Sequence, residues 1–414
     1  MIRIPDTATL SPQAYPSDNR IVYFPSASID LVKIDFLFEA GTFYQPQLLC
    51  ASAASKLYTL ATERMDSASL AEFMDFRGVV IETGCELMQS TLTVYLLRRY
   101  ADEVLGVVND MFRMPAFDSG DFATWQAKRH EEIATYERRT SLMARRIFYW
   151  SLFGAEHPLG RCATADDVYR LGLEGVRSFW QQRYDFGKSR VVAAGSIDGQ
   201  LLTTLSSMLN GATGDCHTES GAPMTVPAHP ATTVHLPIEV ATQTSLRVGR
   251  ILPLDWDSMD YARFTLLVTA LGGYFGSRLM SNLREDKGYT YGIYARTQIY
   301  RGAIVFYIAA DVAAGTSHEA VKEIMRELRR LREEPMGAAE LEMVKTVLAG
   351  DFIRSVEGVF ELSGRHVDMV GTAVDERFTD NLRTAIEKTT AAQLQELAQR
   401  LLVEDDMTVA TAGV

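Results

Sequence analysis

The chain has 414 residues, 47% of them hydrophobic and 23% charged, which is typical of a globular protein long enough for two domains. Its formal net charge of −12 at pH 7 argues against nucleic acid as a partner. No stretch of about 18 apolar residues predicts a transmembrane helix, so no membrane partner is expected. The cysteines are far apart with no Cys-x-x-Cys pair, and the first ten residues lack the apolar core of a signal peptide, which together favour a reducing, cytoplasmic setting.

Strands and helices are both predicted in the first half of the chain. The clearest strand is 31–39, where Val32, Ile34, Phe36 and Phe38 face one way and Lys33, Asp35 and Glu39 face the other, as in a half-buried strand. The remaining pattern predicts strands at 20–24, 79–82, 90–97 and 189–195, and helices at 48–62, 69–77, 100–112, 121–138 and 174–183. The cap of the helix at 121–138 is expected near Ser119 or Asp121.

Residues 210–233 are rich in Gly, Ala, Thr, Pro and Ser without periodicity, and we interpret them as a linker. After it the same order of elements recurs: strand 244–250, helical 261–283, strands 289–297 and 303–311, helices 317–332, 338–354 and 391–402, and strand 407–413. We therefore predict an α+β fold of two similar halves, 1–209 and 234–414, produced by internal duplication. Each half should be a mostly antiparallel sheet with helices on one face.

The most informative stretch is 271–295. Phe275, Leu279 and Leu283 recur every four residues as on one apolar helix face, Gly288 marks the helix exit, and 289–295 alternates as a strand does. Arg284 offers a planar cation with five donors, and seven residues later Tyr291 offers a phenolic hydroxyl. Together they could stabilise negative charge on a substrate carbonyl. The alternative is a surface arginine and a core tyrosine beside a glycine-rich turn.

This stretch resembles the second half of the pitrilysin-like zinc peptidases, which include mitochondrial processing peptidase and insulin-degrading enzyme. The residues that carry the resemblance are Gly276-Ser277-Arg278-Leu279, Leu283-Arg284-Glu285, Gly288 and Tyr291. The resemblance implies a duplicated architecture over nearly the whole chain. It also implies that Arg284 and Tyr291 hold the substrate backbone in an active-site chamber.

The zinc motif of that family is missing. Active members carry His-x-x-Glu-His on the helix after the first long strand, where two His bind zinc and the Glu activates water. Here the family register places Ser52, Ser55 and Lys56 at these positions, and no His occurs between Met1 and Arg129. Glu132 matches the further acidic ligand, but one carboxylate does not hold zinc, and a lysine would repel it.

Three functions remain open. The first is a non-catalytic subunit that binds no cofactor and supplies Arg284 and Tyr291 to a zinc-bearing homologous partner, as in family members that divide labour between two subunits. The pairing would be a heterodimer, or a homodimer if the chain associates with itself, and the ligand a peptide. The second is a structural or peptide-binding homologue with no role in catalysis. The third is a hydrolase with unrecognised chemistry.

Overall fold

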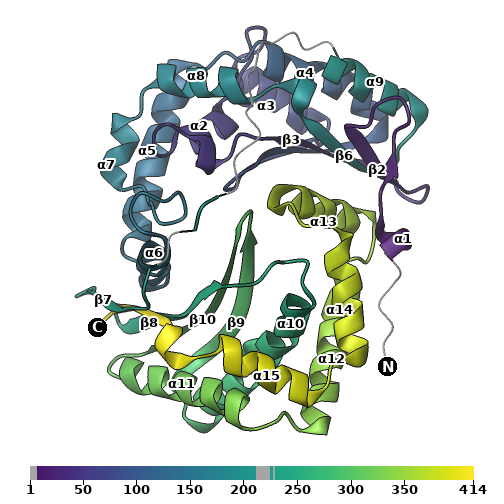
Figure 1. The fold of residues 1–414 in the computed structure, drawn as a ribbon. Helices are drawn as coiled ribbons and strands as arrows, with labels where there is room; N and C mark the ends of the chain where they lie inside the picture. Colours follow the sequence, from purple (N-terminus) through teal and green to yellow (C-terminus); the bar gives the residue numbers. More distant parts are fainter. Residues whose placement is uncertain (1–6, 211–223, 227–228) are drawn as a thin grey trace.

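The computed structural model describes residues 7–210, 224–226 and 229–414, which form two β-sheets with helices around them (Figure 1). The first sheet has the strand order β1-β2-β6-β3-β5-β4. Strands β2 and β6 pair in parallel and all other neighbours pair antiparallel. The strands are β1 Gln13–Ala14, β2 Ile21–Pro25, β3 Leu31–Phe38, β4 Val80–Cys85, β5 Ser90–Leu97 and β6 Arg190–Gly195.

The second sheet has the order β7-β11-β8-β10-β9. Its β7 and β11 pair in parallel, and the remaining pairs are antiparallel. From the parallel pair onward, order and directions match those of β2-β6-β3-β5-β4 in the first sheet. The strands are β7 Thr233–Pro237, β8 Gln243–Leu252, β9 Thr290–Tyr300, β10 Ala303–Ala313 and β11 Thr408–Gly413.

Each sheet packs one face against helices from its own half of the chain. On the first sheet, Val32, Ile34 and Phe36 of β3 contact helices such as α2, α4 and α8 in one core. The helices of the first half are α1 Thr7–Leu10, α2 Cys50–Leu57, α3 Ser67–Phe76, α4 Ala101–Arg113, α5 Ser119–Tyr136, α6 Thr140–Phe153, α7 Ala165–Arg170, α8 Leu173–Arg183 and α9 Gly199–Asn210, with short 3-10 turns at Thr42–Tyr44, Arg98–Tyr100 and Phe186–Lys188.

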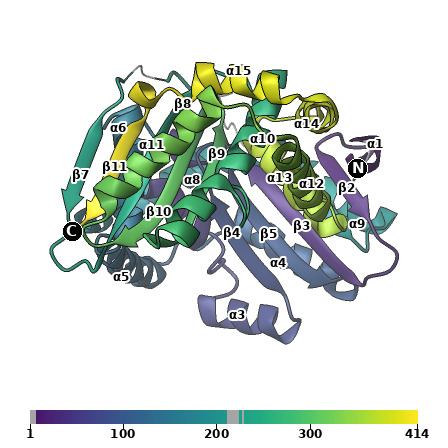
Figure 2. The ribbon, with the colours of Figure 1, turned by 90° about the horizontal axis from the view of Figure 1, so that it is seen from below.

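On the second sheet, Leu246, Val248 and Phe306 pack with α10, α11 and α15. Figure 2 shows α11 and α15 lying across this sheet. The helices of the second half are α10 Met259–Gly272, η4 Met280–Asp286 (a π-helix), α11 Ser317–Glu333, α12 Ala338–Arg354, α13 Val359–Thr372, α14 Glu376–Lys388 and α15 Ala391–Leu401, with a 3-10 turn at Glu404–Asp406.

The opposite face of each sheet is covered in part by a helix from the other half. Helix α13 packs Val359, Phe360 and Val367 against Phe24, Leu37 and Val192 of the first sheet. Helix α6 packs its aromatic side chains against Ala303, Val305 and Ala410 of the second sheet. The expectation of helices on only one face was therefore wrong. The half-buried character of 31–39 was wrong too, because Lys33 and Asp35 lie buried on the face that α13 approaches.

The predicted elements are otherwise present, with ends shifted by a few residues. The cap of α5 is Asp118, whose carboxylate accepts from the backbone N–H groups of Gly120 and Asp121, one residue before the earlier of our two candidates. The predicted linker, 210–233, lies largely outside the described residues, although Met224 is described and is buried beside α6. Within the described part of the chain, no helix combines the length and apolar character needed to cross a membrane.

Candidate functional site

Three successive structures make up the stretch 271–295. Helix α10 ends at Gly272, a turn follows, η4 runs from Met280 to Asp286, and β9 begins at Thr290. Gly288 has a φ of 64°, in the left-handed region that glycine adopts without strain, which confirms it as the exit from the helical part. A π-helix is uncommon, and such turns occur frequently at functional sites.

Side-chain contacts hold this stretch firmly to the second half. Arg278 donates from Nε and Nη2 to the two carboxylate oxygens of Glu340 on α12, at 2.7 and 2.8 Å. Asn282 donates to Glu323 and Glu327 of α11, at 3.0 and 2.7 Å. Leu279 and Leu283 are fully buried. The backbone that leads to Arg284 is therefore fixed by neighbours, as a preorganised site requires.

Arg284 itself takes little part in this anchoring. Its Nε lies 3.3 Å from a carboxylate oxygen of Glu285, a largely exposed neighbour, and its guanidinium lies over the ring of Phe275, 4.8 Å from the centroid. Phe275 is 63% exposed, so the prediction that it shares a buried helix face with Leu279 and Leu283 was wrong. It lies in the turn after α10 and supports the arginine by a cation–π contact instead.

Tyr291 projects from an irregularity in β9. Ile293 pairs with Ala310 and Thr290 with Val312, so Tyr291 and Gly292 together lie opposite the single residue Asp311. This is a β-bulge, a device that re-aims a side chain and that is over-represented next to active sites. The Tyr291 side chain is 97% exposed, which excludes the alternative of a core tyrosine. Among the described residues, no hydrogen bond joins Tyr291 to Arg284.

The helix in the register of the zinc motif is α2, and its serine hydroxyls bond within the helix. Ser52 Oγ donates to the carbonyl of Leu49 and Ser55 Oγ to the carbonyl of Ser52, both at 3.0 Å. Such local bonds to the preceding turn are common for helical serines. These hydroxyls point to the helix backbone, and their chemistry does not suit zinc.

The third position of the zinc-motif register is the positively charged Lys56. The pKa of Lys56 is lowered by partial burial and by the nearby charge of Lys128 on α5. Also on α5, Glu132 forms an ion pair with Arg129, with 3.2 Å between the two charged groups. The acidic residue in the better register for a ligand is therefore paired with an arginine. No cluster of three or more His, Cys, Asp or Glu suited to a metal ion occurs in the described ranges 7–210, 224–226 and 229–414.

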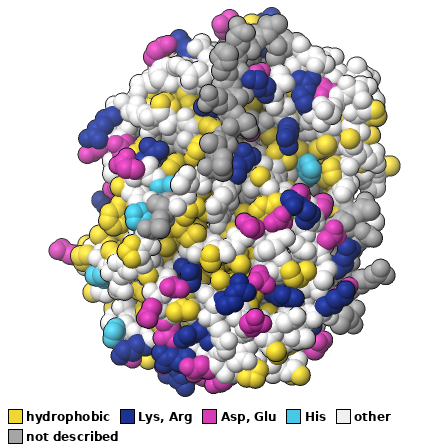
Figure 3. All heavy atoms as spheres, viewed as in Figure 1, with side chains coloured by type: hydrophobic (Ala, Val, Ile, Leu, Met, Phe, Trp, Pro, Cys, Tyr) yellow, Lys and Arg dark blue, Asp and Glu magenta, His cyan; other side chains and the backbone are white. Residues whose placement is uncertain are grey.

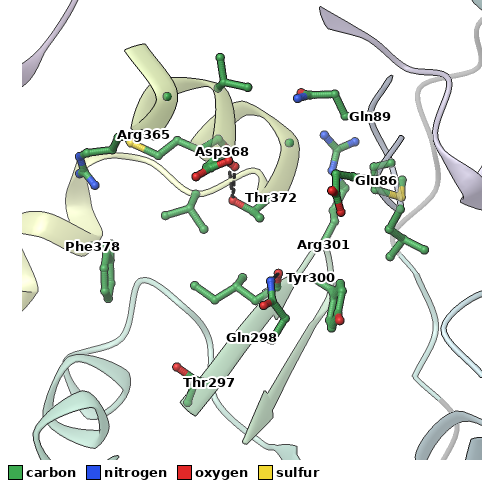
Figure 4. Close-up of a pocket in the computed structure, with 18 of the residues that line it drawn as sticks. Glu86, Gln89, Thr297, Gln298, Tyr300, Arg301, Arg365, Asp368, Thr372 and Phe378 are labelled. Carbon is green, nitrogen blue, oxygen red and sulfur yellow. Dashed lines mark hydrogen bonds between the residues drawn. The ribbon is translucent and has the colours of Figure 1, made fainter. Parts of the chain in front are cut away.

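A cavity of about 950 Å³ lies between the two halves. Figure 4 shows Glu86 and Gln89 of the β4–β5 turn on one side, Arg365 and Asp368 of α13 on another, and Gln298 and Tyr300 of β9 near the base. Figure 3 shows apolar side chains gathered across the middle of the face of the molecule seen in Figure 1. Sequence reasoning missed this cavity, because α13 carries no recognised motif and reaches it only by crossing to the other half.

Comparisons with known proteins agree with the resemblance expected from the sequence. The sequence model described as "Peptidase M16 inactive domain" matches residues 170–348. The "Non-peptidase homolog YmxG" of Helicobacter pylori is 20% identical over 307 residues, which cover 73% of this chain and 70% of that protein. The "Uncharacterized zinc protease YmxG" of Bacillus subtilis is 21% identical over 364 residues, 84% of each chain.

Solved structures show the same fold. The peptidase M16 inactive domain from Pseudomonas fluorescens superposes with a TM-score of 0.85 at 20% identity, over 95% of both chains. A protease from Helicobacter pylori gives 0.84 at 17% identity, over 95% of this chain and 96% of the other. These likenesses establish the architecture, and the site must be argued from its own residues.

Proposed function

We propose that this chain, which is similar to pitrilysin-like (M16) peptidase homologues of the inactive type, is one subunit of a two-subunit zinc peptidase. It binds the peptide and supplies Arg284 and Tyr291 to the active site of a homologous partner that carries His-x-x-Glu-His. The partner holds the zinc and this chain binds no cofactor. A second copy of the same chain could not complete such a site, so the productive complex is a heterodimer.

The observation that carries this proposal is the bulge at Tyr291. The β-bulge in β9 turns the side chain of Tyr291 almost wholly into solvent, where it gains no packing energy. Arg284 lies on a π-helix seven residues earlier and contacts only the exposed neighbours Glu285 and Phe275 through its side chain. Arg278, in contrast, forms two hydrogen bonds with Glu340 of α12. Exposed donors on a rigid support are what a partner's active site can use.

The chemistry of these two side chains suits one task. Peptide hydrolysis passes through a tetrahedral intermediate with negative charge on the former carbonyl oxygen. The guanidinium donates N–H groups and carries a fixed positive charge, and the phenol donates one O–H. Placed around that oxygen, they stabilise the transition state more than the bound peptide. Zinc in the partner would supply the activated water.

We also propose that the chain consists of domains 1–209 and 234–414, joined by 210–233 and derived from one duplicated unit. Supporting this, both sheets share the order and direction of five strands, from the parallel pair to the free edge. Helices α6 and α13 follow this symmetry, since each crosses to the sheet of the other half.

A second candidate is a peptide-binding homologue with no role in catalysis. The cavity of about 950 Å³ favours it, because that cavity is lined by neither Arg284 nor Tyr291. It is large enough for several side chains of an extended peptide.

A reconstitution experiment separates the two candidates. The partner is assayed for cleavage of a fluorogenic peptide, alone and with this chain, and zinc is measured in each protein by elemental analysis. We expect zinc in the partner only, activity only in the mixture, and a loss of activity on the order of 10²-fold with Arg284→Ala. Arg326→Ala removes an exposed, paired arginine on the outer helix α11 and serves as the control. Full activity of Arg284→Ala in an intact complex would leave the binding homologue as the better account.

A further inference from the structure

One open face of the second sheet carries alternating arginine and tyrosine side chains. Ile293 and Ala295 of β9 face the core, so Tyr294 and Arg296 face the other way. On β10 the same face carries Tyr307, which pairs directly with Arg296, and on β8 it carries Arg247. We call Arg247, Tyr294, Arg296 and Tyr307, together with Arg145 of α6, the Arg–Tyr array.

The members of the array contact one another through their rings and guanidinium groups. Arg247 lies over the ring of Tyr307 with 4.7 Å to the centroid, and Arg296 over Tyr294 with 5.1 Å. The two tyrosine rings meet edge to face, with 6.2 Å between centroids. The four side chains therefore form one continuous surface of two cations and two aromatic rings.

Helix α6 extends this surface. Arg145 lies 5.8 Å from the ring centroid of Tyr149, whose hydroxyl accepts a hydrogen bond from Tyr300 at 2.9 Å. Tyr300 and Tyr307 both pack against the cluster that α6 forms on the sheet. Tyr300 also lines the cavity between the halves, so the array continues into it (Figure 4).

The arginines of the array lack acidic partners. In the described part of the chain, the guanidinium groups of Arg145, Arg247 and Arg296 form no ion pair and no hydrogen bond. Other arginines of the second half do form ion pairs, such as Arg278 with Glu340 and Arg329 with Glu404. Asp311, the acid on this face of β10, is hydrogen-bonded to Ser245. In a chain with 53 acidic and 41 basic residues, three unpaired arginines on one face form a local excess of positive charge.

We propose that the Arg–Tyr array binds an extended, acidic segment of a peptide. This assigns a substrate class to the proposed function and rests on it. An extended chain presents every second side chain to the same side, where carboxylates meet the guanidinium groups and the stems lie along the tyrosine rings. The array is open to such a chain, since Arg296 is exposed and Tyr294 is 38% exposed.

Binding can be measured with the full chain alone, without partner or zinc, by fluorescence anisotropy. The probe is a labelled twelve-residue peptide of alternating glutamate and alanine, compared with a lysine–alanine peptide and with a dT12 oligonucleotide. We expect the glutamate peptide to bind at least tenfold more tightly than the lysine peptide. The double variant Arg247→Gln/Arg296→Gln should weaken it on the order of tenfold or more, whereas Arg326→Gln/Arg354→Gln, which removes two exposed arginines that have acidic partners, should not.

A second pair of variants tests the array without replacing any of its members. Gln298 is exposed on the same face of β9, two residues beyond Arg296. Gln298→Glu should weaken binding of the glutamate peptide and Gln298→Lys should strengthen it. Equal binding of the two peptides, unchanged affinity in the array variants, or tighter binding of dT12 would each overturn the proposal. Binding is measured without partner or zinc, so a failure of the proposed function in the turnover assay is seen separately from a failure of the array.

Discussion

Lys33 and Asp35 show how a residue read correctly as polar can still be buried. They alternate with Val32, Ile34 and Phe36 on β3, a pattern that predicts a solvent-facing side. Instead Asp35 is 2% and Lys33 7% exposed, because α13 lies over that face. Their charges are 3.0 Å apart, Lys33 donates to Ser363 of α13, and Thr93 donates to Asp35. No local sequence pattern predicts that this face is covered by α13, a helix 330 residues further along the chain.

We predict that Lys33→Met lowers the free energy of unfolding by about 3–5 kcal/mol, because it leaves the Asp35 carboxylate buried without its cation. The double variant Lys33→Met/Asp35→Leu should recover most of that loss. Urea unfolding followed by circular dichroism measures both. A single variant as stable as the natural protein would mean that water reaches Asp35 despite its burial.

At the scale of residues, the sequence predicts those features of the candidate site that depend only on residue type and spacing. The spacing of Arg284, Gly288 and Tyr291 could be read from the sequence, as could the absence of zinc ligands at Ser52, Ser55 and Lys56. The bulge at Tyr291 could not, because it depends on how β9 pairs with β10. The exposure of Phe275 could not either, because α10 ends at Gly272, before it reaches this residue.

At the scale of elements, most strands and several amphipathic helices were predicted, whereas strands β1 and β7 and helices such as α6, α13 and α14 were not. Helix α11 has a clean apolar stripe through Ala320, Ile324, Leu328 and Leu331. Helix α6 went unrecognised because its buried residues extend around the helix, from Thr140 to Phe153, with no simple stripe. Helix α13 has a single buried residue, Ser363, and its contacts with the first sheet come from partly exposed side chains.

The docking of α13 should depend on pH through His366. This histidine contacts Phe24 of the first sheet, with 6.2 Å between ring centroids. Burial lowers its pKa below the ordinary 6.5, and Arg190 and Arg365 lower it further, while Glu376 opposes them. The unfolded chain therefore binds this proton more readily than the folded chain, so stability is full above about pH 6.5 and falls as the pH drops below it.

We expect His366→Gln to flatten this dependence. The free energy of unfolding of both proteins is measured in urea at pH 7.5 and pH 5.5. Between these pH values, the natural protein should lose more stability than the variant. Other titrating groups are common to both proteins and cancel in the comparison. A difference that is the same at both pH values would show that His366 is not buried enough to matter.

At the scale of the whole molecule, the exchange of α6 and α13 ties the two halves together. Each half has its own core, and among the described residues three further clusters join residues from both halves. Figure 1 shows α6 and α13 on opposite sides of the molecule, each beside the sheet that it covers. The halves should therefore not behave as separable domains, even though the chain is divided between them.

Limited proteolysis tests this linkage. The composition of 210–233 predicts that a protease cuts there first. We expect the two fragments to co-elute in gel filtration after the cut and to separate only in denaturant, because the shared clusters hold them. Fragments that separate in native buffer would contradict the exchange of helices. First cuts within 90–112 or 303–331 would contradict the boundary.

The most direct test of the shared active site is the turnover number of the complex containing Tyr291→Phe. The complex with the zinc-bearing partner is assayed at saturating peptide. The variant lacks only one hydroxyl, on a side chain that is 97% exposed in the natural protein. We expect kcat to fall on the order of 10²-fold with KM little changed and the complex intact by gel filtration, because the hydroxyl acts in the transition state. Tyr169→Phe, which alters another exposed tyrosine on α7, is the control and should keep full activity. An unchanged kcat in an intact Tyr291→Phe complex would contradict the account.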